Sequence, residues 1–269
     1  EIAAIIKKKR LAHCSIVDHN TVAGIRELEA CLEGSGTIVI PGTELTAKDN
    51  EDEVHLLAYD FDIDVVARIL HERNEIVRRQ KIEEVAAALP LFRNEGLTMT
   101  DGLAPTEKKP ASLTTELDIC SHRENQALFR KRHGKELTPE DFYWAYQAPN
   151  KSCAVKRAGV TIEWVVEKFH AVARDLIIAH PFVSVSVVVK PLDEARIHGL
   201  LKRGVTGIEV YHNQTTCEQI QRLKKIVQER GLSYTGGSDA HGKPTDTPIG
   251  QYGSDTVIPN FRLSRHRSD

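Results

Sequence analysis

Short apolar segments alternate with amphipathic ones along most of the chain. Compact apolar runs rich in branched residues predict buried strands, and apolar residues recurring every three to four positions predict helices. Capping residues and glycines mark several helix ends, as at Thr161 and Gly231. Strands are predicted at 11–17, 37–40, 53–59, 176–179, 206–211 and 232–235, and helices at 22–33, 162–174, 193–202 and 217–230. This alternation predicts an α/β protein with a parallel sheet or a barrel.

The alternation is interrupted in the middle of the chain. Residues 64–89 carry apolar side chains at near-helical spacing among many charges, which predicts one long amphipathic helix. A turn-rich loop is predicted at 99–111, followed by helices at 127–133 and 138–146. We therefore expect two domains, one formed by residues 1–63 and 157–269 and a small helical insertion formed by residues 64–156. The aromatic residues of the insertion are expected to build its own small core, and they are Phe142, Tyr143, Trp144 and Tyr146.

Composition narrows the class of protein. The 36 Lys and Arg residues nearly balance the 38 Asp and Glu residues, so net charge does not indicate nucleic acid or a membrane as partner. The five cysteines include no C-x-x-C pair, which favours reduced thiols over a secreted disulfide framework. No apolar run approaches the roughly 20 residues that span a bilayer, and no signal-peptide pattern is present. We expect a cytoplasmic protein. The chain begins with Glu1 rather than Met, which suggests that residues precede it.

Potential metal ligands follow or lie within the predicted strands. Asp239 and His241 are two residues apart after an apolar segment, so in extended backbone both would face one side. Each such residue alone has an ordinary structural alternative, as a helix cap, a turn acid or a buried histidine. Their joint placement in one series of strands and helices is the argument for a site. The six candidates are His19, Glu44, His55, His180, Asp239 and His241. His212 also follows a strand and is a further candidate for a cleft residue.

The chemistry of these side chains indicates divalent metals. Imidazole nitrogens and carboxylate oxygens suit Zn, Mn or Fe, and a bridging glutamate would allow two ions to lie close together. Two such ions activate water and neutralise a phosphoryl group, so hydrolysis of a phosphate ester is the leading hypothesis. Metal-dependent deamination or amide hydrolysis is the competing hypothesis on residue types alone.

Six motifs in order resemble the polymerase and histidinol phosphatase (PHP) superfamily. The step from His19 to Glu44 is 25 residues and the step from there to His55 is 11, as in that family. The resemblance implies a distorted (β/α)7 barrel and a cluster of up to three metal ions. Within the superfamily, the chain looks most like the stand-alone phosphoesterases that carry a helical insertion. The motifs are Val17-Asp18-His19-Asn20-Thr21 with Gly24, Pro41-Gly42-Thr43-Glu44, Val54-His55-Leu56-Leu57, Ala179-His180-Pro181, Gly207-Ile208-Glu209-Val210 and Gly237-Ser238-Asp239-Ala240-His241-Gly242.

The resemblance also implies roles for single residues. Glu44 would bridge two metals, and His55 with His180 would complete one of them. Asp239 would hold the second metal, and His19 with His241 the third. Asp18 would orient this cluster from outside it. His212 or His241 would help the leaving group, so the residues expected to take part in catalysis are His19, Glu44, Asp239, His241 and His212. Arg123 is a candidate for an insertion arginine that contacts phosphate, with a surface ion pair as the alternative.

One departure from the family pattern affects the prediction. The family opens with a strand that carries two histidines and then an aspartate, and these residues are not found in the sequence given. Either the chain lacks its native beginning or it is a degenerate member with a binding or structural role. The prediction is a metal-dependent phosphoesterase with two or three metal ions (Mn, Fe or Zn), acting on a nucleotide or short nucleic-acid end. A histidinol-phosphate-type phosphatase is the alternative enzyme.

Overall fold

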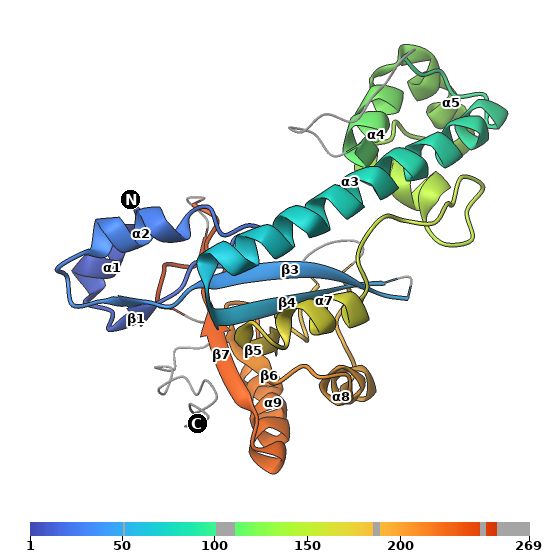
Figure 1. Cartoon of the computed structure of the whole chain (residues 1–269). Helices are drawn as coiled ribbons and strands as arrows, with labels where there is room; N and C mark the ends of the chain where they lie inside the picture. Colours follow the sequence, from blue (N-terminus) through green and yellow to red (C-terminus); the bar gives the residue numbers. More distant parts are fainter. Residues whose placement is uncertain (51, 101–110, 185–188, 243–245, 252–269) are drawn as a thin grey trace. The chain divides into compact units, whose positions relative to one another are not determined.

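The computed structural model describes residues 1–50, 52–100, 111–184, 189–242 and 246–251 (Figure 1). The chain divides into two compact units, one formed by Glu1–Glu72 with Val160–Asp269 and the other by Arg73–Gly159. The elements in chain order are α1 (Ile2–Lys9), β1 (His13–Cys14), α2 (Ile25–Leu32), β2 (Ile38–Val39), β3 (Gly42–Asp49), β4 (Asp52–Phe61), α3 (Ile63–Asn94), α4 (Ala111–Ser121), α5 (Arg123–His133), α6 (Pro139–Phe142), η1 (Tyr143–Gln147), α7 (Ile162–Phe169), β5 (Ala173–Ile178), α8 (Glu194–Lys202), β6 (Gly207–His212), α9 (Cys217–Arg230) and β7 (Ser233–Gly237).

The first unit is built on a five-stranded sheet with the order β3-β4-β5-β6-β7. The pairs β3/β4 and β4/β5 are antiparallel, and the pairs β5/β6 and β6/β7 are parallel. The mixed α/β class is therefore confirmed, but the expectation of a parallel sheet is wrong for two of the four pairs. The cause is the reversal of the chain between Asp49 and Asp52, which pair with each other. Asn50 follows β3 with a φ of 59°. A connection this short can join only antiparallel strands.

Two further strands form a separate small sheet. β1 and β2 pair in parallel, with His13 opposite Ile38. The predicted strand at 11–17 thus shrinks to two residues. After β1, the chain meets β3 through a single parallel bridge between His19 and Glu44. Among the described residues, β3 and β7 are the two edge strands of the larger sheet. Because no described strand is seen to join these edges, closure of the barrel stays a prediction.

The helices of the first unit follow the capping signals of the sequence. Thr161 accepts a hydrogen bond from the Trp164 amide at the start of α7, and Thr216 forms a capping box with Gln219 at the start of α9. Gly231 ends α9 in the left-handed conformation that the sequence predicts. α7 packs on β3 and β5, and α9 packs on β6. Among the described helices, none combines the length and hydrophobicity needed to cross a membrane.

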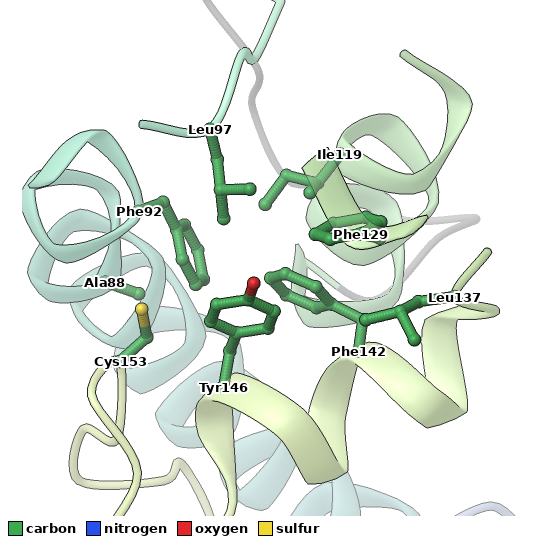
Figure 2. Packing of buried hydrophobic residues seen from close by; sticks show 9 residues of the cluster. All are labelled: Ala88, Phe92, Leu97, Ile119, Phe129, Leu137, Phe142, Tyr146 and Cys153. Atoms are coloured by element: carbon green, nitrogen blue, oxygen red, sulfur yellow. The ribbon is translucent and has the colours of Figure 1, made fainter. Parts of the chain in front are cut away.

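The second unit is helical and has its own core, which Figure 2 shows. Phe142 and Tyr146 stack with ring centroids 5.1 Å apart, and Phe92 and Phe129 pack beside them. The prediction of a separate aromatic core is confirmed for two of its four members, Phe142 and Tyr146. Tyr143 is buried outside this cluster, and Trp144 is 43% exposed. α4 lacks a periodic signal and was not predicted. The loop predicted at 99–111 lies largely outside the described residues.

Candidate metal centre

The β3–β4 hairpin brings the first two candidate ligands together. Glu44 pairs with Leu57 and Thr46 pairs with His55, so Glu44 and His55 are diagonal neighbours on one face of the hairpin. Glu44 Oε1 lies 2.7 Å from His55 Nδ1. Both side chains are buried, so the contact is screened only weakly by solvent.

His180 reaches the same carboxylate from the end of β5. Its Nε2 lies 3.1 Å from Glu44 Oε1 and 3.2 Å from His55 Nδ1. Its backbone is in the left-handed region, with φ 28°, which is unusual for a residue with a side chain. The buried carboxylate of Glu209 accepts a hydrogen bond from the His180 amide at 2.7 Å. Three ligand atoms from three strands thus converge on one point.

His19 is held beside Glu44 by the backbone. The Glu44 amide donates to the Asp18 carbonyl at 3.1 Å, and the Asn20 amide donates to the Glu44 carbonyl at 2.7 Å. His19 Nδ1 lies 3.6 Å from Glu44 Oε2, and half of its side chain is exposed. The Asp18 carbonyl oxygen also accepts a hydrogen bond from the Thr43 hydroxyl at 3.1 Å, so the Asp18 backbone links the segment before His19 to β3.

Asp239 is the centre of a second group at the end of β7. Its Oδ2 lies 3.5 Å from His212 Nε2, and its Oδ1 lies 3.7 Å from His241 Nδ1. Asp239 is also in the left-handed region, with φ 48°. His241 Nδ1 is 2.9 Å from the Asp239 carbonyl oxygen, and half of the His241 side chain is exposed.

A row of four imidazole rings links the two groups. The centroid distances are 5.3 Å from His19 to His55, 5.1 Å from His55 to His180 and 5.6 Å from His180 to His212. His212 is 1% exposed and faces Asp239. The two groups therefore form one continuous site along the ends of β5, β6 and β7.

The electrostatics keep the central carboxylate ionised. Burial alone would raise the pKa of Glu44, but hydrogen bonds to His180 and His55 outweigh it and lower that pKa well below its usual range. Burial opposes protonation of His180, but its contact with Glu44 and the charges of Glu209 and Asp239 leave its pKa raised. Burial raises the pKa of Glu209. The site thus concentrates negative charge on Glu44.

These residues fit a divalent cation. His55 Nδ1 and His180 Nε2 face each other and the same carboxylate oxygen, an arrangement in which a metal would satisfy all three lone pairs at once. His19, Glu44 and His55 also offer ligand atoms that all lie within 4.8 Å of one another. Two imidazoles and a carboxylate are a donor set for Zn, Mn or Fe.

The structure brings four of the six nominated ligands together around Glu44, namely His19, Glu44, His55 and His180, and it places Asp239 and His241 in the second group beside His212. Two other nominations fare differently. His212, which was expected to touch substrate or leaving group, is 1% exposed and faces Asp239. Arg123 lies exposed at the start of α5 in the second unit. Sequence reasoning gave no role to Glu209, although an acid inside the apolar strand 206–211 was a usable signal.

Comparisons with known proteins agree with this geometry. The chain is 24% identical to a 5′-3′ exoribonuclease of Haemophilus influenzae over 237 residues, which cover 84% of the chain and 78% of that protein. It is also 24% identical to the 5′-3′ exoribonuclease Rnm of Escherichia coli, over 86% of the chain and 76% of that protein. No protein-family model matches the chain.

Solved structures show the same kind of fold. A proposed metal-dependent phosphoesterase from Bifidobacterium adolescentis superposes with a TM-score of 0.58 at 22% identity, covering 93% of the chain and 85% of that structure. An amidohydrolase from Chromobacterium violaceum superposes with a TM-score of 0.59 at 18% identity, covering 96% of the chain and 86% of that structure. These likenesses show the fold, and the names of the curated relatives agree with the prediction of an enzyme that hydrolyses phosphate esters.

Proposed function

We propose that the chain is a PHP-type phosphoesterase that uses divalent metals to hydrolyse phosphodiester bonds at the 5′ end of short RNA. The observation that carries the proposal is the convergence of His55 Nδ1 and His180 Nε2 on Glu44 Oε1 within 3.2 Å. The names of the two exoribonucleases support the choice of substrate class. The name of one structural neighbour supports a phosphate ester as the bond that is cleaved.

The candidate residues would act as metal ligands. Glu44, His55 and His180 would hold one ion, and Asp239 with His19 and His241 would hold one or two others. Bound Mn²⁺, Fe²⁺ or Zn²⁺ would supply an activated water and neutralise the phosphate oxygens. Glu44 stays ionised because its pKa is lowered, so it can share its two oxygens between ions. His241 Nδ1 lies 2.9 Å from the Asp239 carbonyl oxygen, so the neutral ring would carry its proton on Nδ1 and leave the Nε2 lone pair to bind an ion.

The distorted (β/α)7 barrel belongs to the same proposal. An isolated parallel bridge between His19, which follows β1, and Glu44 of β3 supports this proposal, because it links the segment after β1 to the larger sheet. The helical unit, residues 73–159, would be an insertion in this barrel. Arg123 of that unit is proposed to contact substrate phosphate, which its exposure allows.

The test is cleavage of a short RNA by the full chain loaded with Mn²⁺. The RNA carries a 5′ phosphate and a fluorophore at its 3′ end, so removal of nucleotides from the 5′ end produces a ladder of labelled products. We expect this ladder with Mn²⁺ and its loss with a chelator. Glu44→Gln should lower the rate at least about 100-fold, since even residues behind the ligands change activity 10- to 100-fold.

Glu53→Gln is the matched control. Glu53 lies on β4 of the same hairpin, opposite Lys48, and is outside the cluster of ligands. It should leave the rate unchanged. Turnover of histidinol phosphate with no RNA cleavage would select the alternative enzyme, and absence of bound metal in the wild-type chain would select a binding module.

A further inference from the structure

β6 lies between the two strands that carry proposed ligands, yet it supplies no ligand itself. β5 leads to His180 and β7 leads to Asp239, and both strands pair with β6. β6 contributes two buried polar side chains to this region, Glu209 at 5% exposure and His212 at 1%. Buried ionisable groups persist in a strand only where they have partners, so these two residues call for an explanation.

An irregularity in β6 places both side chains on the same side of the sheet. Glu209 pairs with Thr235 and Tyr211 pairs with Gly236, so β6 has one more residue than β7 between these two pairs. Residues three apart in a regular strand face opposite sides. The extra residue of a β-bulge shifts this alternation by one position, so the side chains of Glu209 and His212 point to the same face of the sheet.

Glu209 stabilises the unusual backbone of His180. Its Oε2 accepts the His180 amide at 2.7 Å, where φ is 28°. A non-glycine residue in this region costs of order 1–3 kcal/mol and persists only when its surroundings hold it. The Glu209 carboxylate is tightly enclosed, because a Cβ added at Gly237 would lie 3.0 Å from its Oε1. The carboxylate therefore accepts a hydrogen bond from the chain after β5 and lies against Gly237 of β7.

His212 on β6 faces the side chain of Asp239, which follows β7. Its Nδ1 accepts a hydrogen bond from the Gln214 amide at 3.3 Å, so the neutral ring carries its proton on Nε2. That N–H is buried, and among the described residues no hydrogen bond satisfies it. Asp239 Oδ2 lies 3.5 Å away. A buried donor without an acceptor costs about 1–3 kcal/mol, which favours an Asp239 rotamer that faces the ring.

We infer that β6 is the positioning strand of the metal centre, in which Glu209 orients His180 and His212 orients Asp239. Neither residue touches substrate or metal, and each acts through the ligand on the neighbouring strand. This inference rests on the proposed function, because it assumes that His180 and Asp239 bind metal. It gives His212 a different role from the one expected from the sequence.

The test measures Mn²⁺ binding by calorimetry, so it does not depend on turnover. Glu209→Met and His212→Met remove the acceptor and the donor at similar volume, and each should weaken Mn²⁺ binding about 10- to 100-fold. Glu209→Gln keeps an acceptor oxygen and His212→Gln keeps an N–H donor, so both should bind within about threefold of wild type. Asp175→Asn, which changes another fully buried acid of the same sheet, should bind like wild type.

A spectroscopic measurement separates positioning from a general loss of structure. Bound Co²⁺ has absorption bands that depend on the arrangement of its ligands, so the bands should shift in the methionine variants and not in the glutamine variants. If Glu209→Met does not fold, Gly237→Ala replaces it, because the added Cβ presses on the carboxylate and leaves both polar groups in place.

The outcomes are distinguishable from a failure of the proposed function. A wild-type chain that binds neither Mn²⁺ nor Co²⁺ refutes the metal centre itself. If the wild type binds metal, and the folded methionine variants or Gly237→Ala bind it with the same affinity and the same Co²⁺ bands, the positioning role alone is overturned. Glutamine variants as weak as the methionine variants would overturn the hydrogen-bond mechanism.

Discussion

Glu116 in α4 of the helical unit gives a prediction whose size follows from the structure. Burial raises the pKa of Glu116 from 4.5 to about 7, against the opposing charges of Arg157 and Lys81. At 1.36 kcal/mol per pKa unit, this rise corresponds to about 3 kcal/mol, which we reduce to about 2 kcal/mol for the part of the side chain that water reaches. Glu116→Gln should therefore stabilise the unit by about 2 kcal/mol at pH 8.

The sign of the pH dependence follows from the direction of the pKa change. A raised native pKa means that the ionised acid costs stability, and this cost begins above pH 4.5 and is complete above about pH 7. Glutamine does not ionise, so the advantage of the variant should be small at pH 5 and full at pH 8. The new amide also offers a donor to Gln147 Oε1, which is buried and has no hydrogen-bond partner among the described residues.

The assay is urea unfolding of the full chain, followed by fluorescence. The chain has two tryptophans, so Trp164→Phe leaves Trp144 of η1 as a reporter of the helical unit. Free energies of unfolding are compared at pH 5 and pH 8, and Glu124→Gln on the exposed side of α5 is the control. Equal stability of variant and parent at pH 8, or the same gain at both pH values, would refute the reasoning.

Three further predictions concern the first unit. Gly207→Ala should cost about 3 kcal/mol in urea unfolding, because a Cβ there would lie 2.4 Å from the Ser233 carbonyl oxygen and force β6 from β7. Asp49→Asn should destabilise the chain at pH 7 and destabilise it less in acid. Burial would raise the pKa of Asp49, but hydrogen bonds from Arg203 and Arg196 outweigh it and lower that pKa, so the stability that the carboxylate contributes is lost as the pH falls below 3.8, the usual pKa of an aspartate. A free-energy difference between variant and wild type that is the same at pH 7 and pH 3 would contradict this. Mn²⁺ at 100 times its Kd should add about 2.7 kcal/mol to the free energy of unfolding, so a chelator should lower the melting temperature. Melting curves that coincide with and without chelator would argue against a bound ion.

The local elements were predictable where a helix has a cap and a periodic face. α9 occupies the predicted residues because Thr216, Gly231 and its apolar positions all agree. β3 was missed, since its polar residues alternate poorly and its pairing with β4 depends on contacts between strands. The direction of β4 could not be predicted from its own hydrophobic pattern, because it depends on the short connection between Asp49 and Asp52 rather than on the strands themselves.

The candidate ligands could be nominated from the sequence, whereas the residues proposed to position them could not. A polar residue that ends an apolar strand stands out in a sequence, and His180 and Asp239 were both found in this way. How such a residue is held depends on which strand lies next to it in the sheet. The neighbour of both residues is β6, and this order follows from the fold rather than from local composition.

The role of His212 illustrates the limit most clearly. Its position after an apolar strand favours a cleft residue, and a regular strand would turn it away from the side that Glu209 faces. The extra residue in β6 changes this, because it turns His212 toward Asp239 and buries it. A bulge leaves no mark in the hydrophobic pattern of its own strand, since it is defined by the register with a partner. Polar residues next to a bulge are therefore best assigned only after the register is known, and in this chain that assignment turns an expected proton donor into a support for a ligand.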